Sequence, residues 1–269
     1  MEWGRILVPL AGVAEDAHAL GAGAAIAARF EAELAAVYAP PDPTELAPWL
    51  GEGFVGGVQA SAIESLREAG AEGEALARAT FEAEAYASKT FKALKPPVWR
   101  AMALECRLAD LVVFDDRPAK GKGPFAETFE QVLMEERAAT LISRSGADPF
   151  GTAVVAWDGG EPASRAARRA VPLLRRAKRV LIVGAPLSER PCDLGQLQAY
   201  YAARGLEAEA KALDKAPDMA APILQVASDE GAGLLVAGAF GRSRLREFIF
   251  GGTTRALLHA DGPSLFVAH

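Results

Sequence analysis

The stretch Ala153-Val-Val-Ala-Trp-Asp-Gly159 decides the fold, because the chain carries a second stretch of the same kind, Arg5-Ile-Leu-Val-Pro-Leu-Ala-Gly12. Each is a short apolar run that ends in a glycine. Each is followed by an alanine-rich stretch with helical character, about residues 15–29 and 161–175. Short apolar runs that alternate with helices are typical of parallel strands buried on both faces. The repeat therefore predicts two α/β units of the same design.

Further strand-like stretches recur in the same order in both halves. The corresponding pairs are 35–40 with 181–186, 109–114 with 232–237, and 140–143 with 264–268. This order predicts two tandem, doubly wound parallel sheets of the Rossmann-like kind. Gly, Asp and Pro residues near 145–149 are typical of a joint between domains. We therefore expect one domain over residues 1–146 and a second over residues 147–269.

The halves differ in their middle parts. The first half has a Gly-rich loop, residues 51–57, and a long helical stretch, about 58–93. Residues 98–108 are too few for a further strand and helix, so we expect the first half to be abbreviated there. The second half predicts a helix at about 194–204, a strand at 206–212 and a helix at about 218–230.

Composition and charge exclude several classes of protein. Of 269 residues, 51% are hydrophobic and the net charge is −6, which argues against a nucleic-acid or anionic-membrane surface. No apolar run approaches the roughly 20 residues that span a bilayer, and the N-terminus starts a strand rather than a signal peptide. Cys106 and Cys192 lie one in each half, without metal-ligand spacing. We expect a cytoplasmic protein that binds no membrane, nucleic acid or metal.

The strongest functional motif lies near the C-terminal end. Gly238-Ala-Phe-Gly241 is followed by nine residues and then by Gly251-Gly252-Thr253-Thr254. Glycine permits close approach of the backbone, and a helix N-terminus offers N–H groups and a positive dipole end to a phosphate. Asp158 and Gly184 follow or end neighbouring strands, where ligands of doubly wound sheets bind. Together these segments predict a mononucleotide pocket.

These residues make the second half similar to the universal stress protein family, whose ATP-binding members carry G-x-x-G, nine residues, then G-[S/T]. The first half resembles the family only in strand order, so the whole chain resembles a tandem universal stress protein. The resemblance implies an adenine nucleotide alpha hydrolase-like fold, a regulatory role in stress response and ATP binding, with AMP or another phosphate-bearing ligand left open. The implied binding residues are Asp158, Gly184, Gly238, Gly241, Gly251, Gly252, Thr253 and Thr254.

One position departs from the family pattern. Gly252 stands where nucleotide-binding members have Ser or Thr, although Thr253 or Thr254 could supply a hydroxyl after a small shift of the loop. A competing interpretation is that the glycines only allow a tight turn against the sheet. The motif and its context favour phosphate binding.

The first half departs further. Ala11 stands where Asp158 stands, Asp115 falls opposite Gly238 with Asp116 beside it, and Glu127 falls near the place of Gly251. Two unit charges about 4 Å apart repel by roughly 4 kcal/mol at an effective dielectric constant of 20. We therefore expect a degenerate, empty first site. Alternatively, Asp115 and Asp116 only cap a turn.

Family members commonly pair through their last strands, which here implies that the Leu141 strand pairs with the Leu265 strand in an intrachain pseudo-dimer. A homodimer of the whole chain stays open. The first hypothesis is a non-enzymatic ATP-binding protein with one competent site, in residues 150–269. The alternative is an interaction scaffold without nucleotide, and a weaker one is a slow ATPase, because no catalytic grouping accompanies Asp158. The protein partner is unknown.

Overall fold

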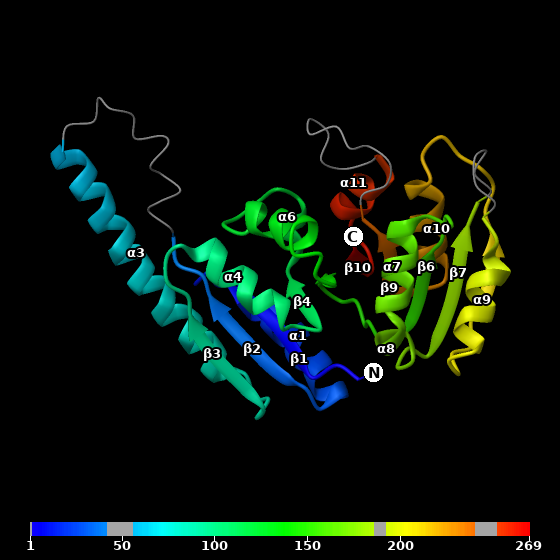
Figure 1. The fold of residues 1–269 in the computed structure, drawn as a ribbon, viewed down its shortest axis with the longest axis horizontal. Coiled ribbons are helices and arrows are strands. Elements are labelled where there is room, and N and C mark those ends of the chain that lie inside the picture. The colour runs from blue at the N-terminus through cyan, green and yellow to red at the C-terminus, as the bar shows by residue number, and fades with distance from the viewer. Residues whose placement is uncertain (1, 42–55, 186–191, 240–251) are drawn as a thin grey trace. The chain divides into compact units, whose positions relative to one another are not determined.

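The chain forms two compact units (Figure 1). The computed structural model describes residues 2–41, 56–185, 192–239 and 252–269. The N-terminal unit is Trp3–Asp115, and the C-terminal unit is Asp116–His269 together with Met1–Glu2. The segment 116–146 closes the first repeat in sequence but packs with the C-terminal unit. The sequence repeat places the domain boundary at residues 146/147, whereas the compact units divide at residues 115/116. The domain limits inferred from the repeat therefore stay a prediction.

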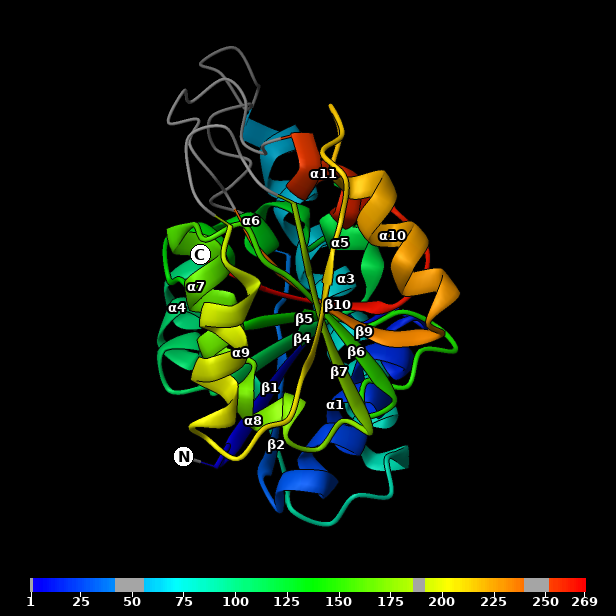
Figure 2. The same ribbon diagram turned by 90° about the vertical axis from the view of Figure 1, so that its right-hand side faces the viewer.

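The N-terminal unit is built on a parallel sheet with the strand order β3-β2-β1-β4. Its strands are β1 (Arg5–Leu10), β2 (Glu33–Tyr38), β3 (Lys89–Ala93) and β4 (Leu111–Phe114), and its helices are α1 (Asp16–Phe30), α3 (Gly56–Ala83) and α4 (Val98–Arg107). Helices α1 and α4 lie on opposite faces of the sheet (Figures 1 and 2). Because both faces are covered, Ile6, Leu7 and Val8 of β1 are all 0% exposed.

The C-terminal unit repeats this design with the strand order β5-β10-β9-β6-β7-β8. Its strands are β5 (Thr140–Ile142), β6 (Thr152–Ala156), β7 (Arg179–Gly184), β8 (Glu209–Ala212), β9 (Ala232–Gly238) and β10 (Ser264–Ala268). Its helices are α5 (Asp116–Ala119), α6 (Ala126–Met134), α7 (Glu161–Arg169), α8 (Val171–Leu174), α9 (Leu194–Ala202), α10 (Ala220–Asp229) and α11 (Gly252–His259). Figure 2 shows α7 and α9 on one face of the strands and α10 on the other. The β6, β7, β8, β9 and β10 strands run parallel.

The sequence predicted most of these elements, but not the middle of the N-terminal unit. The expected helix over 58–93 ends at Ala83, and β3 follows at Lys89–Ala93. The expectation of an abbreviated first half was therefore wrong, because residues 98–108 need to supply only α4. The strand was missed because its residues, Lys-Thr-Phe-Lys-Ala, are polar and half exposed at the sheet edge. The Lys89 ammonium donates to the Phe81 and Glu84 carbonyls, which closes the helix end before the strand begins.

The predicted pairing between the last strand of the first half and the last strand of the second half is confirmed. β5 pairs antiparallel with β10, with Leu141 opposite Phe266 and Ile142 opposite Leu265. Leu141 and Leu265 are therefore offset by one residue in this register. Both strands are fully buried, so a slip by one residue would turn every side chain to the other face of the sheet.

Arg144, just beyond β5, ties α11 to the sheet. Its side chain is buried, with the residue 5% exposed. The guanidinium donates to the carbonyls of Leu257 and Pro263, each at 2.8 Å, and of Leu258 at 3.2 Å. Burial lowers the pKa of Arg144, and the carboxylates of Asp116 and Asp261 oppose that shift. The cation thus stabilises the last carbonyls and the negative dipole end of α11.

Replacing Arg144 with Met should lower the free energy of unfolding by about 2–4 kcal/mol, because buried carbonyls of α11 lose their charged donor. Arg255→Met is the matched control, since Arg255 is an exposed arginine on the same helix. It should change stability by no more than about 0.5 kcal/mol. Urea denaturation of both variants checks this, and equal losses would contradict the role given to Arg144.

Candidate functional site

The carboxyl ends of β6, β7 and β9 lie at one edge of the C-terminal sheet. Asp158 follows β6 after one residue, Gly184 ends β7 and Gly238 ends β9. β6 lies between β7 and β9 in the sheet, and the chain winds from β6 first to β7 and later back to β9. This reversal beside β6 is where doubly wound sheets form their ligand crevice. The structure therefore brings three of the predicted residues to the expected place.

Asp158 presents a carboxylate at this edge. The residue is exposed, and its Oδ1 accepts a hydrogen bond from the backbone N–H of Gly160 at 2.7 Å. Gly159 between them has φ of +69°, a left-handed conformation that favours glycine. The turn leads directly into α7, which begins at Glu161. The backbone thus holds one carboxylate oxygen in place while the side chain as a whole stays accessible to a ligand.

Gly184 is required by close packing beside Asp158. A Cβ atom at this position would lie 2.1 Å from the carbonyl oxygen of Trp157 and 3.0 Å from Sγ of Cys192. The Cys192 thiol donates to the same carbonyl at 3.2 Å. Burial, and then the charges of Asp158 and Asp193, raise the pKa of Cys192. Sequence reasoning did not place Cys192 at this edge, because no motif or spacing marks it.

Close packing also explains why a glycine is needed at position 238. A Cβ atom here would lie 2.4 Å from the backbone nitrogen of Ala163 and 2.6 Å from the carbonyl carbon of Pro162. The first turn of α7 therefore rests directly on the end of β9. Gly238 therefore has a packing role in the fold, and the choice between phosphate binding and a tight turn against the sheet stays a prediction.

The start of α11 lies beside Gly238. The Thr254 hydroxyl donates to the Gly238 carbonyl at 3.5 Å, the long end of the hydrogen-bond range. Thr253 is half buried, and a Cβ atom added at Gly252 would meet no atom of the described residues within 4 Å. The first N–H groups of a helix have no partner within the helix. Gly241 and Gly251 lie outside the described residues.

The same edge of the N-terminal unit is arranged differently. The carboxylate of Asp16, which is 3% exposed, accepts from the backbone N–H groups of Ala11, Gly12 and Val13 at 3.1, 2.7 and 3.1 Å. These amides follow β1, as the Asp158 turn follows β6 in the other unit. An internal carboxylate therefore already occupies the N–H groups that an anionic ligand could use.

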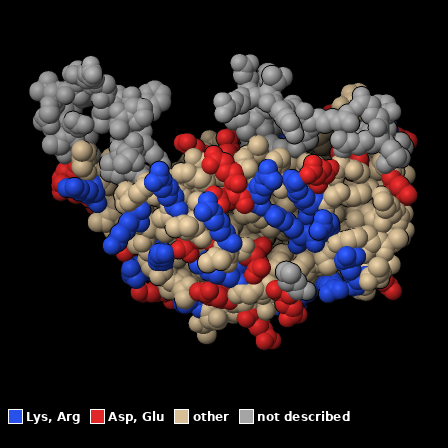
Figure 3. Space-filling model, in the orientation of Figure 1, with Lys and Arg blue, Asp and Glu red and all other residues tan. Residues whose placement is uncertain are grey.

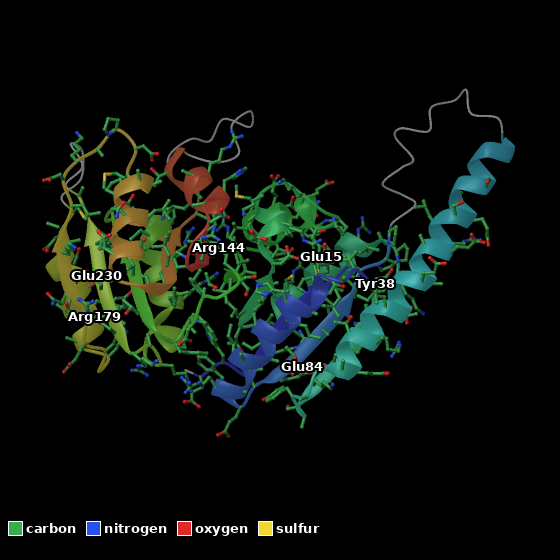
Figure 4. The ribbon with its side chains drawn as sticks, turned by 180° about the vertical axis from the view of Figure 1, so that it is seen from behind. Glu15, Tyr38, Glu84, Arg144, Arg179 and Glu230 are labelled. Atoms are coloured by element: carbon green, nitrogen blue, oxygen red, sulfur yellow. The ribbon has the colours of Figure 1, made fainter. Side chains whose placement is uncertain are left out.

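Helix α3 covers this edge. A Cβ atom at Gly12 would lie 2.4 Å from the backbone of Gly73, so the loop after β1 touches the helix directly. The Tyr38 hydroxyl at the end of β2 donates to the Gly70 carbonyl at 2.9 Å, and Figure 4 shows Tyr38 facing α3. Burial, with added effects of Glu74 and Asp16, raises the pKa of Tyr38. The space beyond β1 and β2 is thus filled by the chain itself.

The acidic residues expected at the first site occupy the predicted elements. Asp115 follows β4 directly, Asp116 begins α5, and Glu127 lies in the first turn of α6. Asp116 pairs with Lys120 at 2.6 Å, and Lys120 also reaches Asp261 at 3.0 Å. That the first site is empty stays a prediction. Asp16 and α3 add a physical reason for it that the sequence did not reveal.

Two searches of the described ranges give negative results. In the parts of the chain that the structure describes, no group of three or more His, Cys, Asp or Glu side chains is arranged to hold a metal ion. Over the same residues, no helix is both long enough and apolar enough to cross a membrane.

A family comparison identifies the part of the chain that carries this site. Residues 149–267 match the model of the Universal stress protein family. Over these residues the chain is similar to the universal stress protein family. The matched range contains all eight residues that the sequence predicted for binding. For the chain before residue 149, the prediction of a second universal stress protein domain is supported by fold alone.

Solved structures extend the likeness in fold to nearly the whole chain. A universal stress protein from Archaeoglobus fulgidus is 15% identical, with a TM-score of 0.65 over 98% of this chain and 95% of its own. A functionally unknown protein from Pseudomonas aeruginosa is 14% identical, with a TM-score of 0.58 over 99% of this chain and 92% of its own. No curated protein matches by sequence. The predicted tandem of Rossmann-like sheets is thereby confirmed.

The glycines of the motif should respond differently to alanine. Gly184→Ala and Gly238→Ala should each lower the free energy of unfolding by about 1–3 kcal/mol, because the new methyl group collides with backbone atoms. Gly252→Ala meets no atom of the described residues and should change the free energy of unfolding by less than about 1 kcal/mol. Chemical denaturation of the three variants measures this. A large loss at Gly252, or none at Gly238, would contradict the packing described.

Proposed function

We propose that the universal stress protein domain binds one adenine nucleotide, ATP or a close relative, at the edge of the sheet between Asp158 and the start of α11. The observation that carries the proposal is the contrast between the two units. At the C-terminal edge, Asp158 is exposed, and a Cβ atom at Gly252 would meet no atom of the described residues within 4 Å. At the N-terminal edge, Asp16 and α3 fill the corresponding place.

Each residue takes a distinct role in the proposed complex. The Asp158 carboxylate accepts hydrogen bonds from ribose hydroxyls or a base amino group, with the Gly160 amide fixing its orientation. The N–H groups at the start of α11 receive the phosphates. Thr254 uses its hydroxyl on the Gly238 carbonyl, so Thr253 is the better donor to phosphate. Gly241 and Gly251 complete the motif in the sequence.

The proposed role is binding and regulation in a stress response rather than catalysis, in a cytoplasmic setting. Asp158 is the acidic group that the proposal places against the nucleotide, and its bond to Gly160 suits it to hold a ligand in place rather than to shuttle protons.

One observation favours the scaffold alternative. The close contacts at Gly184 and Gly238 explain both glycines by packing, without reference to a ligand. If these glycines serve packing alone, the fold persists without nucleotide and the chain acts through its surfaces. Titration with ATP separates the two functions.

Isothermal titration should give one ATP site per chain with a Kd in the micromolar range. Asp158→Ala should weaken binding at least about tenfold, because a charged hydrogen bond to the ligand is worth about 1.5–3 kcal/mol. Asp148→Ala is the matched control: Asp148 accepts from the Phe150 N–H at 3.0 Å in the same kind of turn, but before β6 rather than after it. Its ATP affinity should equal that of the wild type.

Three outcomes would change the proposal. Failure to saturate at millimolar ATP would favour the scaffold. Two sites per chain would show that the N-terminal edge also binds. Formation of ADP that depends on Asp158 would support the slow ATPase instead.

A further inference from the structure

Helix α4 presents an exposed apolar face in the N-terminal unit. Its inner face is fixed by Met102 and Cys106, which are 0% and 3% exposed. On the outer face Leu104 is 61% exposed, and Leu108, directly after the helix, is 78% exposed. Exposed large aliphatic side chains on adjacent turns are uncommon on a surface that contacts only water.

Basic side chains border this face. Arg100 and Arg107, both exposed, lie one turn before and one turn after Leu104, and together with Trp99 and Ala103 they line a hollow on the helix. Figure 3 shows Lys and Arg side chains gathered over the region of α4. Glu105 of the same helix is already paired with Arg5 and Lys92, each at 2.6 Å. The face therefore fits an apolar partner that carries negative charge.

Helix α3 of the same chain carries both the negative charge and the exposed apolar side chain that would complement this face of α4. It is 28 residues long, about 42 Å at 1.5 Å per residue, whereas its neighbouring six-residue strand β2 extends about 20 Å. Figure 1 shows its N-terminal turns extending past the sheet of its own unit. Glu64, Glu68 and Glu72 follow one another on successive turns and are all exposed, and Leu76, one turn further, is 45% exposed.

These glutamates are unfavourable for the helix on its own. Like charges four residues apart destabilise a helix. Glu64 contacts Arg67 at 3.5 Å, but among the described side chains no ion pair is formed by Glu68 or Glu72. Cations from outside the helix that face Glu64, Glu68 and Glu72 would therefore stabilise α3.

Both helices are held rigidly in their own unit. The contacts of Gly73 and Tyr38 fix α3, and the buried side chains of Met102 and Cys106 fix α4. The acidic face of α3 and the basic, apolar face of α4 can therefore meet only between two copies of the chain.

We propose that the protein self-associates by docking α3 of one copy on the outer face of α4 of a second copy. Glu68 and Glu72 then face Arg100 and Arg107, and Leu76 packs against Leu104. One helix pair is small beside the 1,200 Å² or more that specific interfaces bury, so the contact forms twice about a two-fold axis. The association is weak and weakens further with salt, because exposed ion pairs are screened.

A charge exchange tests the interface. Sedimentation equilibrium of the wild type at low salt should show a monomer–dimer equilibrium. Arg100→Glu/Arg107→Glu should raise the dimer Kd at least about tenfold, since like charges then face each other. Adding Glu68→Arg/Glu72→Arg to that variant should restore association to within about threefold of the wild type, which a folding defect could not produce.

A control separates charge from position. Lys122→Glu/Lys215→Glu changes the net charge equally on exposed residues of the C-terminal unit and should leave the dimer Kd unchanged. A wild-type chain that stays monomeric up to about 1 mM overturns the proposal. A dimer that ignores the Arg100/Arg107 exchange also overturns it, because the copies then meet elsewhere.

Discussion

The buried guanidinium of Arg144 is the interaction on which the C-terminal edge depends. Helix α11 is only eight residues long, and isolated helices of that length are unstable in water. Arg144 holds its last turn and the carbonyl of Pro263, immediately before β10 (Figure 4). The position of the helix start beside Gly238 therefore rests on a cation at its opposite end. Arg144 follows β5, so the segment that ends the first repeat stabilises the proposed site of the second.

The two units solve the same structural problem in opposite ways. Each parallel sheet ends in backbone N–H groups that need an acceptor. In the N-terminal unit Asp16 supplies it from within the chain, and α3 packs directly against the loop after β1. In the C-terminal unit the Asp158 turn is satisfied internally, but at the start of α11 no described atom would lie within 4 Å of a Cβ atom at Gly252. The difference lies in local acceptors and in one inserted helix, not in the order of the strands.

The sequence predicts what depends on local pattern. Buried strands such as β1 and β6 are continuous apolar runs, and parallel strands place their carboxyl ends together, so Asp158, Gly184 and Gly238 could be assigned to one edge. The sequence did not predict β3, because an edge strand can form without a continuous run of apolar residues. The contacts of Gly238 with Pro162 and of Gly12 with Gly73 join residues far apart along the chain, and no single-sequence signal reports such distances.

The contact between Gly12 and Gly73 has a consequence for related chains. Gly12, with φ of +75°, leaves room for the backbone of Gly73, whereas Gly73 leaves room for the Tyr38 side chain that packs against α3. A side chain at position 12 would displace α3 from the end of β1 and uncover the amides that Asp16 now holds. The two positions therefore form a joint signature that can be read directly from an alignment. Relatives with glycine at both can keep this edge sealed, whereas those with a larger residue at position 12 must leave it open or close it by another route.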